Sequence, residues 1–355
     1  MYKYLIRPLL FLIDPERVHH IVVFMVKLIN RIPGLYTCFR NYHTDHSKSD
    51  SIHVAGLQFK GRVGLAAGFD KNADFYKEFS MFGFSFIEIG TVTPVPQTGN
   101  PKPRLFRLQR DKAFINRMGF NNKGVEHAVG QLKRRDKNLI IGGNIGKNTT
   151  TPNENAADDY AVCFEKLYNE VDYFTVNVSC PNIAGLDKLQ DMDSLRIILN
   201  RLGKIRTLKK QYKPVFVKIS PDLSFKQIDD VLVLIRETGF DGIIAANTST
   251  SRKDMVTGTD RITAIGPGGL SGKPLTNRTL EIVSYICKQT EHAMPVIGVG
   301  GIMNTEDALN LIKAGACLIQ VYSGFIYEGP LLMRRINRAL QEYDNKDMDE
   351  MSQKV

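Results

Sequence analysis

Eight short segments dominated by apolar and small residues recur along the chain, and this recurrence constrains the fold more than any other feature. The segments are almost continuously hydrophobic, as expected of strands buried on both faces of a parallel sheet. Helical patterns separate most of them, so the alternation predicts an α/β fold, a (β/α)8 TIM barrel. The segments are VGLAAGF (63–69), FSFIEIGTV (84–92), LIIGGNIG (139–146), YFTVNVS (173–179), PVFVKIS (214–220), GIIAANT (242–248), PVIGVGG (295–301) and CLIQVYSG (317–324).

The first 45 residues differ from this repeating part. Two apolar-rich runs, YLIRPLLFLI (4–13) and IVVFMVKLINRI (21–32), are joined by DPERVHH. Neither run reaches the roughly 18 to 20 apolar residues that span a bilayer, and the interrupting charges do not fit a signal peptide. We therefore expect two domains. Residues 1–45 form an amphipathic two-helix hairpin, which docks on the barrel or lies in a membrane surface, and residues 46–355 form the barrel.

The charge and the cysteine and histidine content limit the kinds of partner and cofactor that the chain is expected to bind. The formal net charge of +10 can serve nucleic acid or an anionic membrane surface. Tryptophan is absent and the basic residues are scattered, so nucleic-acid binding is not expected. The five cysteines show no CxxC spacing, which disfavours a metal site, an iron–sulfur cluster and a disulfide framework. No histidine ends a predicted strand, which gives little support to histidine-based acid–base chemistry.

Polar residues gather where the predicted strands end, and in a parallel barrel these ends share one face. Long inserts after the second and sixth strands, at about 93–124 and about 249–275, reach the same face. Buried lysines and asparagines need partners that offset their desolvation, and a bound ligand would supply them. The polar strand-end residues are Lys71, Thr91, Asn144, Asn177, Cys180, Lys218, Asn247 and Thr248.

Glycine-rich segments end the last two strands. GVGG (298–301) and YSG (322–324) place unhindered backbone N–H groups where TIM barrels commonly bind phosphate, and GGLSGKP (268–274) adds a further glycine-rich loop. The phosphate can belong to a substrate or to a cofactor.

FMN suits a redox reaction here because a chain with no metal-ligand cluster needs an electron sink. The ammonium of Lys218 could neutralise the electron-rich reduced flavin, and the amides of Asn144 and Asn177 could match the edge of a flat heterocycle.

Ten blocks of the sequence resemble the dihydroorotate dehydrogenase family. They cover nearly the whole chain: AAGFDK (66–71), EIGTVTP (88–94), GNPKPRLFRL (99–108), INRMGFNN (115–122), NIGKN (144–148), VNVSCPN (176–182), VKISPDLS (217–224), GGLSGKPL (268–275), GVGGI (298–302) and YSGFIYEGP (322–330). The hairpin, with DPERVH (14–19), further resembles the quinone-dependent, membrane-associated class, in which it forms the entrance tunnel for the quinone.

The resemblance implies residue roles by position. FMN would contact Ala67, Gly68, Thr91, Asn144, Asn177, Lys218, Gly272, Gly301, Tyr322 and Ser323. Dihydroorotate would be held by Lys71, Asn116, Arg117, Met118, Gly119, Phe120, Asn177, Asn182, Asn247 and Thr248. His19 and Arg107 would line the quinone end.

The resemblance also implies the reaction. Cys180 would take the C5 proton of dihydroorotate while C6 passes hydride to the flavin, and a membrane quinone would reoxidise the flavin. The pathway would be pyrimidine synthesis, with no iron–sulfur partner. With no Arg-rich presequence before the hairpin, we expect a peripheral protein on the cytoplasmic face of a bacterial inner membrane.

Two residues depart from the pattern of the membrane-associated class. Cys180 stands where that class usually has Ser, and Cys is typical of the soluble classes. Ala246 stands where the class usually has Thr. The cysteine leaves fumarate open as the oxidant. A cofactor-free lyase or isomerase of the same fold and a non-catalytic lipid-binding module are the remaining alternatives.

Overall fold

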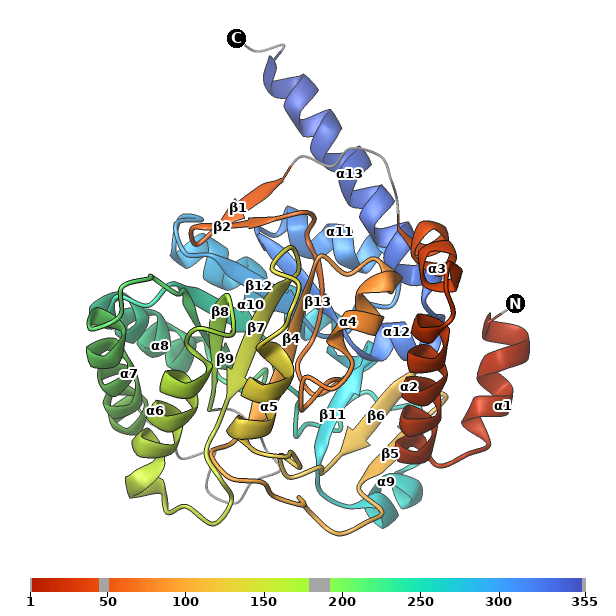
Figure 1. The fold of residues 1–355 in the computed structure, drawn as a ribbon, viewed down its shortest axis with the longest axis horizontal. Helices are drawn as coiled ribbons and strands as arrows, with labels where there is room; N and C mark the ends of the chain where they lie inside the picture. The colour runs from red at the N-terminus through yellow and green to blue at the C-terminus, as the bar shows by residue number, and fades with distance from the viewer. Residues whose placement is uncertain (1, 45–50, 179–191, 353–355) are drawn as a thin grey trace.

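The eight predicted strands form a closed parallel barrel (Figure 1). The computed structural model describes residues 2–44, 51–178 and 192–352. Around the barrel the strands follow their order in the sequence, with the last pairing to the first. They are β3 (Val63–Leu65), β4 (Phe86–Val92), β7 (Ile140–Ile145), β8 (Tyr173–Asn177), β9 (Val215–Ile219), β10 (Gly242–Ala245), β12 (Val296–Val299) and β13 (Leu318–Val321). The TIM-barrel prediction is confirmed.

Helices surround the barrel and bury their apolar faces on the outer sides of the strands (Figure 1). Helix α8 shows how the sequence sets such a helix. Ser224 and Gln227 form a capping box at its start, and Gly239 ends it at φ +68°. The helices that follow the barrel strands are α4 (Tyr76–Phe79), α5 (Val125–Leu132), α6 (Ala156–Leu167), α7 (Met192–Thr207), α8 (Phe225–Thr238), α10 (Thr276–Gln289), α11 (Thr305–Lys313), α12 (Ser323–Glu328) and α13 (Leu331–Ser352).

A short hairpin of β1 (Ile52–Val54) and β2 (Leu57–Phe59) lies at the amino end of the barrel. The ring of Phe59 packs edge-on against Phe86 on β4, with 5.3 Å between the ring centroids. This apolar contact belongs to the cluster that fills the amino half of the barrel interior. The polar residues are therefore concentrated toward the carboxyl half.

The two long inserts meet in a three-stranded antiparallel sheet, here called the insert sheet. It consists of β5 (Leu105–Leu108), β6 (Ala113–Asn116) and β11 (Gly269–Gly272). The second insert also carries α9 (Thr259–Ile265). The expectation of a glycine-rich loop at 268–274 was wrong for most of that segment, because β11 pairs along its whole length with β6.

The N-terminal extension contains more helices than the two-helix expectation. A π-helical turn (Tyr2–Ile6) leads into α1 (Arg7–Phe11), followed by α2 (Pro15–Arg31) and α3 (Leu35–His43). The third helix was missed because it is short and mixed in polarity. Pro33 and Gly34, the latter at φ +78°, separate it from α2. Figure 1 shows the extension along one side of the molecule, where α2 packs on α4 and β5 and α3 packs on α13.

Candidate active site

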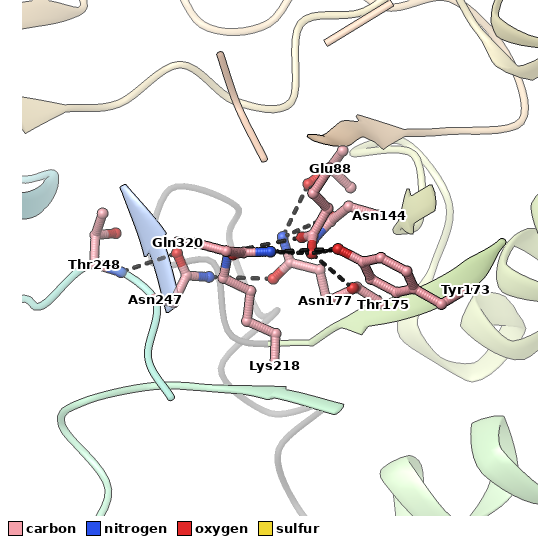
Figure 2. Close-up of polar contacts among 10 residues, drawn as sticks. Glu88, Asn144, Tyr173, Thr175, Asn177, Lys218, Asn247, Thr248 and Gln320 are labelled. Carbon is pink, nitrogen blue, oxygen red and sulfur yellow. Dashed lines mark hydrogen bonds and ion pairs between the residues drawn. The ribbon is translucent and has the colours of Figure 1, made fainter. Parts of the chain in front are cut away.

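Four polar side chains from barrel strands and strand ends form one hydrogen-bonded chain at the carboxyl face of the barrel. Thr91 Oγ1 donates to Asn144 Oδ1 at 2.6 Å. Asn177 Nδ2 donates to Thr91 Oγ1 at 2.9 Å and lies 3.3 Å from Asn144 Oδ1. Asn247 Nδ2 donates to Asn177 Oδ1 at 3.1 Å (Figure 2). The prediction that these residues meet is confirmed, because β4, β7 and β8 are neighbours in the barrel.

A buried carboxylate, Glu88, lies beneath this chain and was not anticipated. Glu88 is on β4 and fully inaccessible to solvent. Its Oε1 accepts from Asn144 Nδ2 at 2.8 Å. Its Oε2 accepts from Gln320 Nε2 at 2.7 Å, Thr175 Oγ1 at 3.0 Å and the Tyr173 hydroxyl at 3.2 Å (Figure 2). Burial, and to a lesser degree Glu88, raise the pKa of the Tyr173 phenol, which therefore remains a neutral donor.

Lys218 on β9 points toward the same carboxylate. Its Nζ lies 4.0 Å from Glu88 Oε1, and both side chains are buried. A buried cation is costly unless it is paired, so Glu88 provides part of what holds Lys218 in the barrel. The sequence predicted a cation at this position but not its anionic partner.

Lys71 lies in the loop after β3, half-buried at the mouth of the barrel. Burial lowers the pKa of its ammonium to about 8, and Arg104 lowers it further, against the raising effects of Glu16 and Asp70. The carboxylate of Asp70 accepts the backbone N–H groups of Asp74 and Phe75, each at 2.9 Å. These bonds shape the loop that presents Lys71, which remains largely protonated at neutral pH.

The segment from Asn116 to Phe120 leaves the insert sheet at the end of β6. Asn116 Nδ2 donates to the carbonyl of Gly269 at 3.2 Å. Arg117 donates to the carbonyl of Pro267 at 3.1 Å and lies over the ring of Phe106, 4.5 Å from its centroid. Arg117 thus ties the two inserts together. Met118 and Gly119 continue the loop to Phe120, which adopts φ +51°.

The glycines after β12 bring backbone close to the start of α10. Gly300 and Gly301 have φ values of +132° and +72°. A Cβ on Gly301 would lie 2.3 Å from the backbone nitrogen of Thr276, so only glycine fits there. Ser323 Oγ lies 3.1 Å from Ser271 Oγ, which joins the end of β13 to β11. The ends of three strands therefore converge, as the predicted phosphate site requires.

The first and last barrel strands also meet at this edge. The Tyr322 hydroxyl donates to the carbonyl of Gly68 at 3.4 Å, and Gly68 itself adopts φ +94° next to Ala67. Gly272, at φ +103°, ends β11, and a Cβ there would lie 2.3 Å from the carbonyl oxygen of Lys112. The predicted FMN-contacting residues thus surround one end of the barrel.

The two residues predicted to line the quinone end occupy different surroundings. His19 on α2 packs edge-on against Phe69 and Phe75, with centroids 5.2 and 5.5 Å apart. Burial, with the charge of Lys71 as a second cause, lowers the pKa of His19 to about 3, so its ring is neutral. Arg107 on β5 instead donates to the carbonyl oxygens of Phe11 and Ile13 and fastens the extension to the insert sheet.

A second fastening, between Glu16 and Arg104, was missed from the sequence. Arg104 Nη2 lies 2.7 Å from Glu16 Oε1, and Arg104 Nε lies 3.2 Å from Glu16 Oε2. Both side chains are largely buried. The signal available was an acidic residue at the start of an apolar helix and an arginine inside the first insert, but their pairing is a tertiary contact.

Two predicted residues, the base Cys180 and the substrate contact Asn182, lie outside the described residues. Asn177, which precedes them in the sequence, and Thr248 are described. The carbonyl of Asn177 accepts the Tyr160 hydroxyl at 2.7 Å, and the Thr248 N–H donates to Asn247 Oδ1 at 2.9 Å. Ala246 is buried, and its N–H donates to the carbonyl of Val299 at 2.7 Å.

The residues that the structure describes contain neither a metal-binding cluster nor a single membrane-spanning helix. Among them, no group of three or more His, Cys, Asp or Glu side chains could hold a metal ion. In the same part of the chain no single helix is long and apolar enough to cross a membrane. Helices α2 and α3 pass that test only as a pair, which is bent by 115°.

Fold and site together define a TIM-barrel enzyme whose polar site lies at the carboxyl ends of its strands. The family model for dihydroorotate dehydrogenase matches residues 50–343, and the chain therefore belongs to the dihydroorotate dehydrogenase family.

Curated relatives resemble the chain over nearly its full length. A protein of Christiangramia forsetii named dihydroorotate dehydrogenase (quinone) is 49% identical, over 96% of this chain and 99% of its own. One of the same name from Idiomarina loihiensis is 45% identical, over 94% and 98%. The solved structure of the Eimeria tenella enzyme with ferulenol has a TM-score of 0.82 at 35% identity, covering 94% of this chain and 92% of the other.

Proposed function

We propose that the protein oxidises dihydroorotate to orotate and passes the electrons to a quinone, as a step of pyrimidine synthesis. The family assignment and the shared name of the relatives support this reaction. The observation that carries it is the hydrogen-bonded chain of buried Thr91, Asn144 and Asn177 with half-buried Asn247, and Lys218 close by. A planar ring with carbonyl, N–H and carboxylate groups matches such a set of amides and cations.

FMN is the cofactor that we propose for this barrel. The residues fit it in two respects. At Gly301 and Gly272 a Cβ would collide with the backbone of Thr276 and Lys112, so glycine lets these segments pack closely, and Ser323 lies beside Ser271 at the end of the same sheet; backbone N–H groups at such glycine-rich strand ends are what a phosphate group binds. Lys218, Asn144 and Asn177 supply a cation and amides for the ring system. FMN, when bound, would provide the hydride acceptor.

The roles proposed for the other residues follow from the resemblance to the family. Lys71 and the loop from Asn116 to Phe120 lie on the same side as the amide chain and would hold the substrate carboxylate and ring, together with Asn182 and Thr248. Cys180 would remove the C5 proton. A thiol, with a reference pKa near 8.5, is well matched to this task near neutral pH. The identity of this residue bears on the first half of the reaction and not on the choice of oxidant.

The N-terminal extension, residues 1–45, would form the quinone entrance and attach the barrel domain, residues 46–355, to an anionic membrane surface. Helices α1 and α2 and the turn between them expose large apolar side chains, among them Leu9 at 66%, Leu12 at 85% and Phe24 at 69%. Apolar side chains at this density suit insertion into the headgroup boundary of a bilayer. His19, which is neutral and packed among aromatic rings, would border the quinone path, and Arg107 would hold the segment that encloses it. We place the protein at the cytoplasmic face of a bacterial inner membrane.

An assay of the oxidant distinguishes the proposed quinone-linked reaction from its nearest alternative, the same dehydrogenation with fumarate as the oxidant. Purified protein should contain FMN and oxidise dihydroorotate with a short-chain quinone. Turnover with fumarate alone would overturn the quinone assignment. A colourless protein that releases no FMN on denaturation would instead favour a cofactor-free reaction of the same fold.

A further inference from the structure

Glu88 is a fully buried carboxylate that contacts the site, and the proposed reaction gives it no direct role. It is enclosed in the barrel beneath Asn144 and Lys218. Its two oxygens accept from four side chains, and each donor is neutral. This arrangement suits an ionised carboxylate, which accepts at both oxygens and donates at neither.

The carboxylate determines which way Asn144 faces. Because Asn144 Nδ2 donates to Glu88 Oε1, Asn144 Oδ1 is turned toward Thr91 Oγ1 and Asn177 Nδ2. With its Nδ2 turned to these partners, Asn177 presents Oδ1 to Asn247 Nδ2. The direction of every hydrogen bond in the chain therefore follows from the acceptor at its inner end.

The orientation of the Gln320 side-chain amide shows that Glu88 requires hydrogen-bond donors around it. Gln320 Nε2 donates to Glu88 Oε2 at 2.7 Å, while its buried Oε1 has no hydrogen-bond partner in the described part of the chain. A buried acceptor without a partner is unfavourable. The amide adopts this orientation because the opposite one would turn its oxygen toward the carboxylate.

We infer that Glu88 is a positioning residue for the flavin site: it orients the Asn144–Thr91–Asn177–Asn247 chain and partly neutralises Lys218. The inference rests on the proposed function, since it concerns how the chain receives FMN. Replacing the carboxylate by an amide would introduce a donor where Asn144 already donates, and would leave Lys218 with more net positive charge. A more positive site favours the electron-rich reduced cofactor, so the midpoint potential should rise.

Glu88→Gln, with Tyr173→Phe as the matched control, tests the inference. Tyr173→Phe removes one donor from Oε2 but leaves the bond between Glu88 Oε1 and Asn144 in place. Glu88→Gln should bind FMN about tenfold more weakly or worse, as expected for loss of a charge-assisted buried bond, and its bound flavin should have a more positive midpoint potential. Tyr173→Phe should retain the wild-type affinity and potential even where its melting temperature falls.

The outcomes separate the two proposals. Equal FMN affinity and potential in Glu88→Gln and wild type would overturn the role of Glu88 while leaving the reaction intact. A wild-type protein that holds FMN but does not oxidise dihydroorotate would overturn the reaction alone, and one that binds no FMN would overturn both. If Glu88→Gln does not fold, Glu88→Asp keeps the charge but withdraws it from Asn144. It should weaken FMN binding without raising the potential, and wild-type affinity in that variant would refute the inference.

Discussion

Arg104→Met should release helix α2 from the insert sheet. Arg104 makes two bonds to Glu16, at 2.7 and 3.2 Å, and two more to the carbonyl oxygens of Thr98 and Asn100, at 2.7 and 2.9 Å. Removing one partner of a buried ion pair costs about 3 to 5 kcal/mol because the other charge is left uncompensated. Lys102, 3.5 Å from Glu16 but mostly exposed, can move closer, so we expect the lower end of this range.

The assay is hydrogen exchange of the α2 amides in the native protein. A cost of about 3 kcal/mol corresponds to a local opening equilibrium raised about 100-fold, since 1.4 kcal/mol is a factor of ten. Arg338→Met is the matched control, because its pair with Glu342 on α13 is exposed and worth at most about 1 kcal/mol. Exchange in α2 that matched wild type after Arg104→Met would refute the reasoning.

The same ion pair predicts a pH dependence. Burial by itself raises the pKa of Glu16, but the hydrogen bond and charge of Arg104 outweigh it and leave the pKa below the ordinary value of 4.5. A lowered pKa in the folded state means that the stabilisation is present above the pKa of the unfolded chain and is lost as pH falls through the folded value. The protection factors of the α2 amides, taken relative to intrinsic exchange at each pH, should therefore fall on acidification below about pH 4.5, and less so in Glu16→Gln.

Three further predictions concern turnover. Cys180→Ala should retain FMN, but dihydroorotate should reduce that FMN about 100-fold more slowly or worse. An unchanged rate of flavin reduction would remove Cys180 from the mechanism. Cys38→Ala, at an exposed site, serves as the control. Deleting residues 1–45 should impair vesicle binding and quinone turnover more than flavin reduction, and intact quinone turnover would contradict the assigned entrance. The value of kcat/KM for dihydroorotate should fall above about pH 8 as the Lys71 ammonium loses its proton, and a Lys71→Met variant should lack that limb.

The barrel was predictable because its strands are short, apolar on both faces and regularly spaced, so the local pattern carries the fold. The insert sheet was not, because its strands are short, and β11 pairs with the β5–β6 hairpin across a long sequence separation that no local pattern reveals. The buried role of Glu88 was not predictable, because a single acidic residue in a hydrophobic run gives no sign of its four hydrogen-bond donors. In the sequence Glu88 stands out only as the first residue of the motif EIGTVTP (88–94). Helix α3 was missed because it is short and mixed in polarity, and the contacts that it makes with α13 are tertiary.

Both arginines that hold the N-terminal extension, Arg104 and Arg107, belong to the same insert as the proposed substrate loop, Asn116 to Phe120. The insert that carries β5 and β6 thus contacts the N-terminal helices at one end and leads into the proposed substrate loop at the other. A change in the length or twist of the β5–β6 hairpin should therefore shift both the N-terminal helices and the proposed substrate loop. Under the proposed roles, substitutions in this insert that change the preference for a quinone should also change the affinity for dihydroorotate.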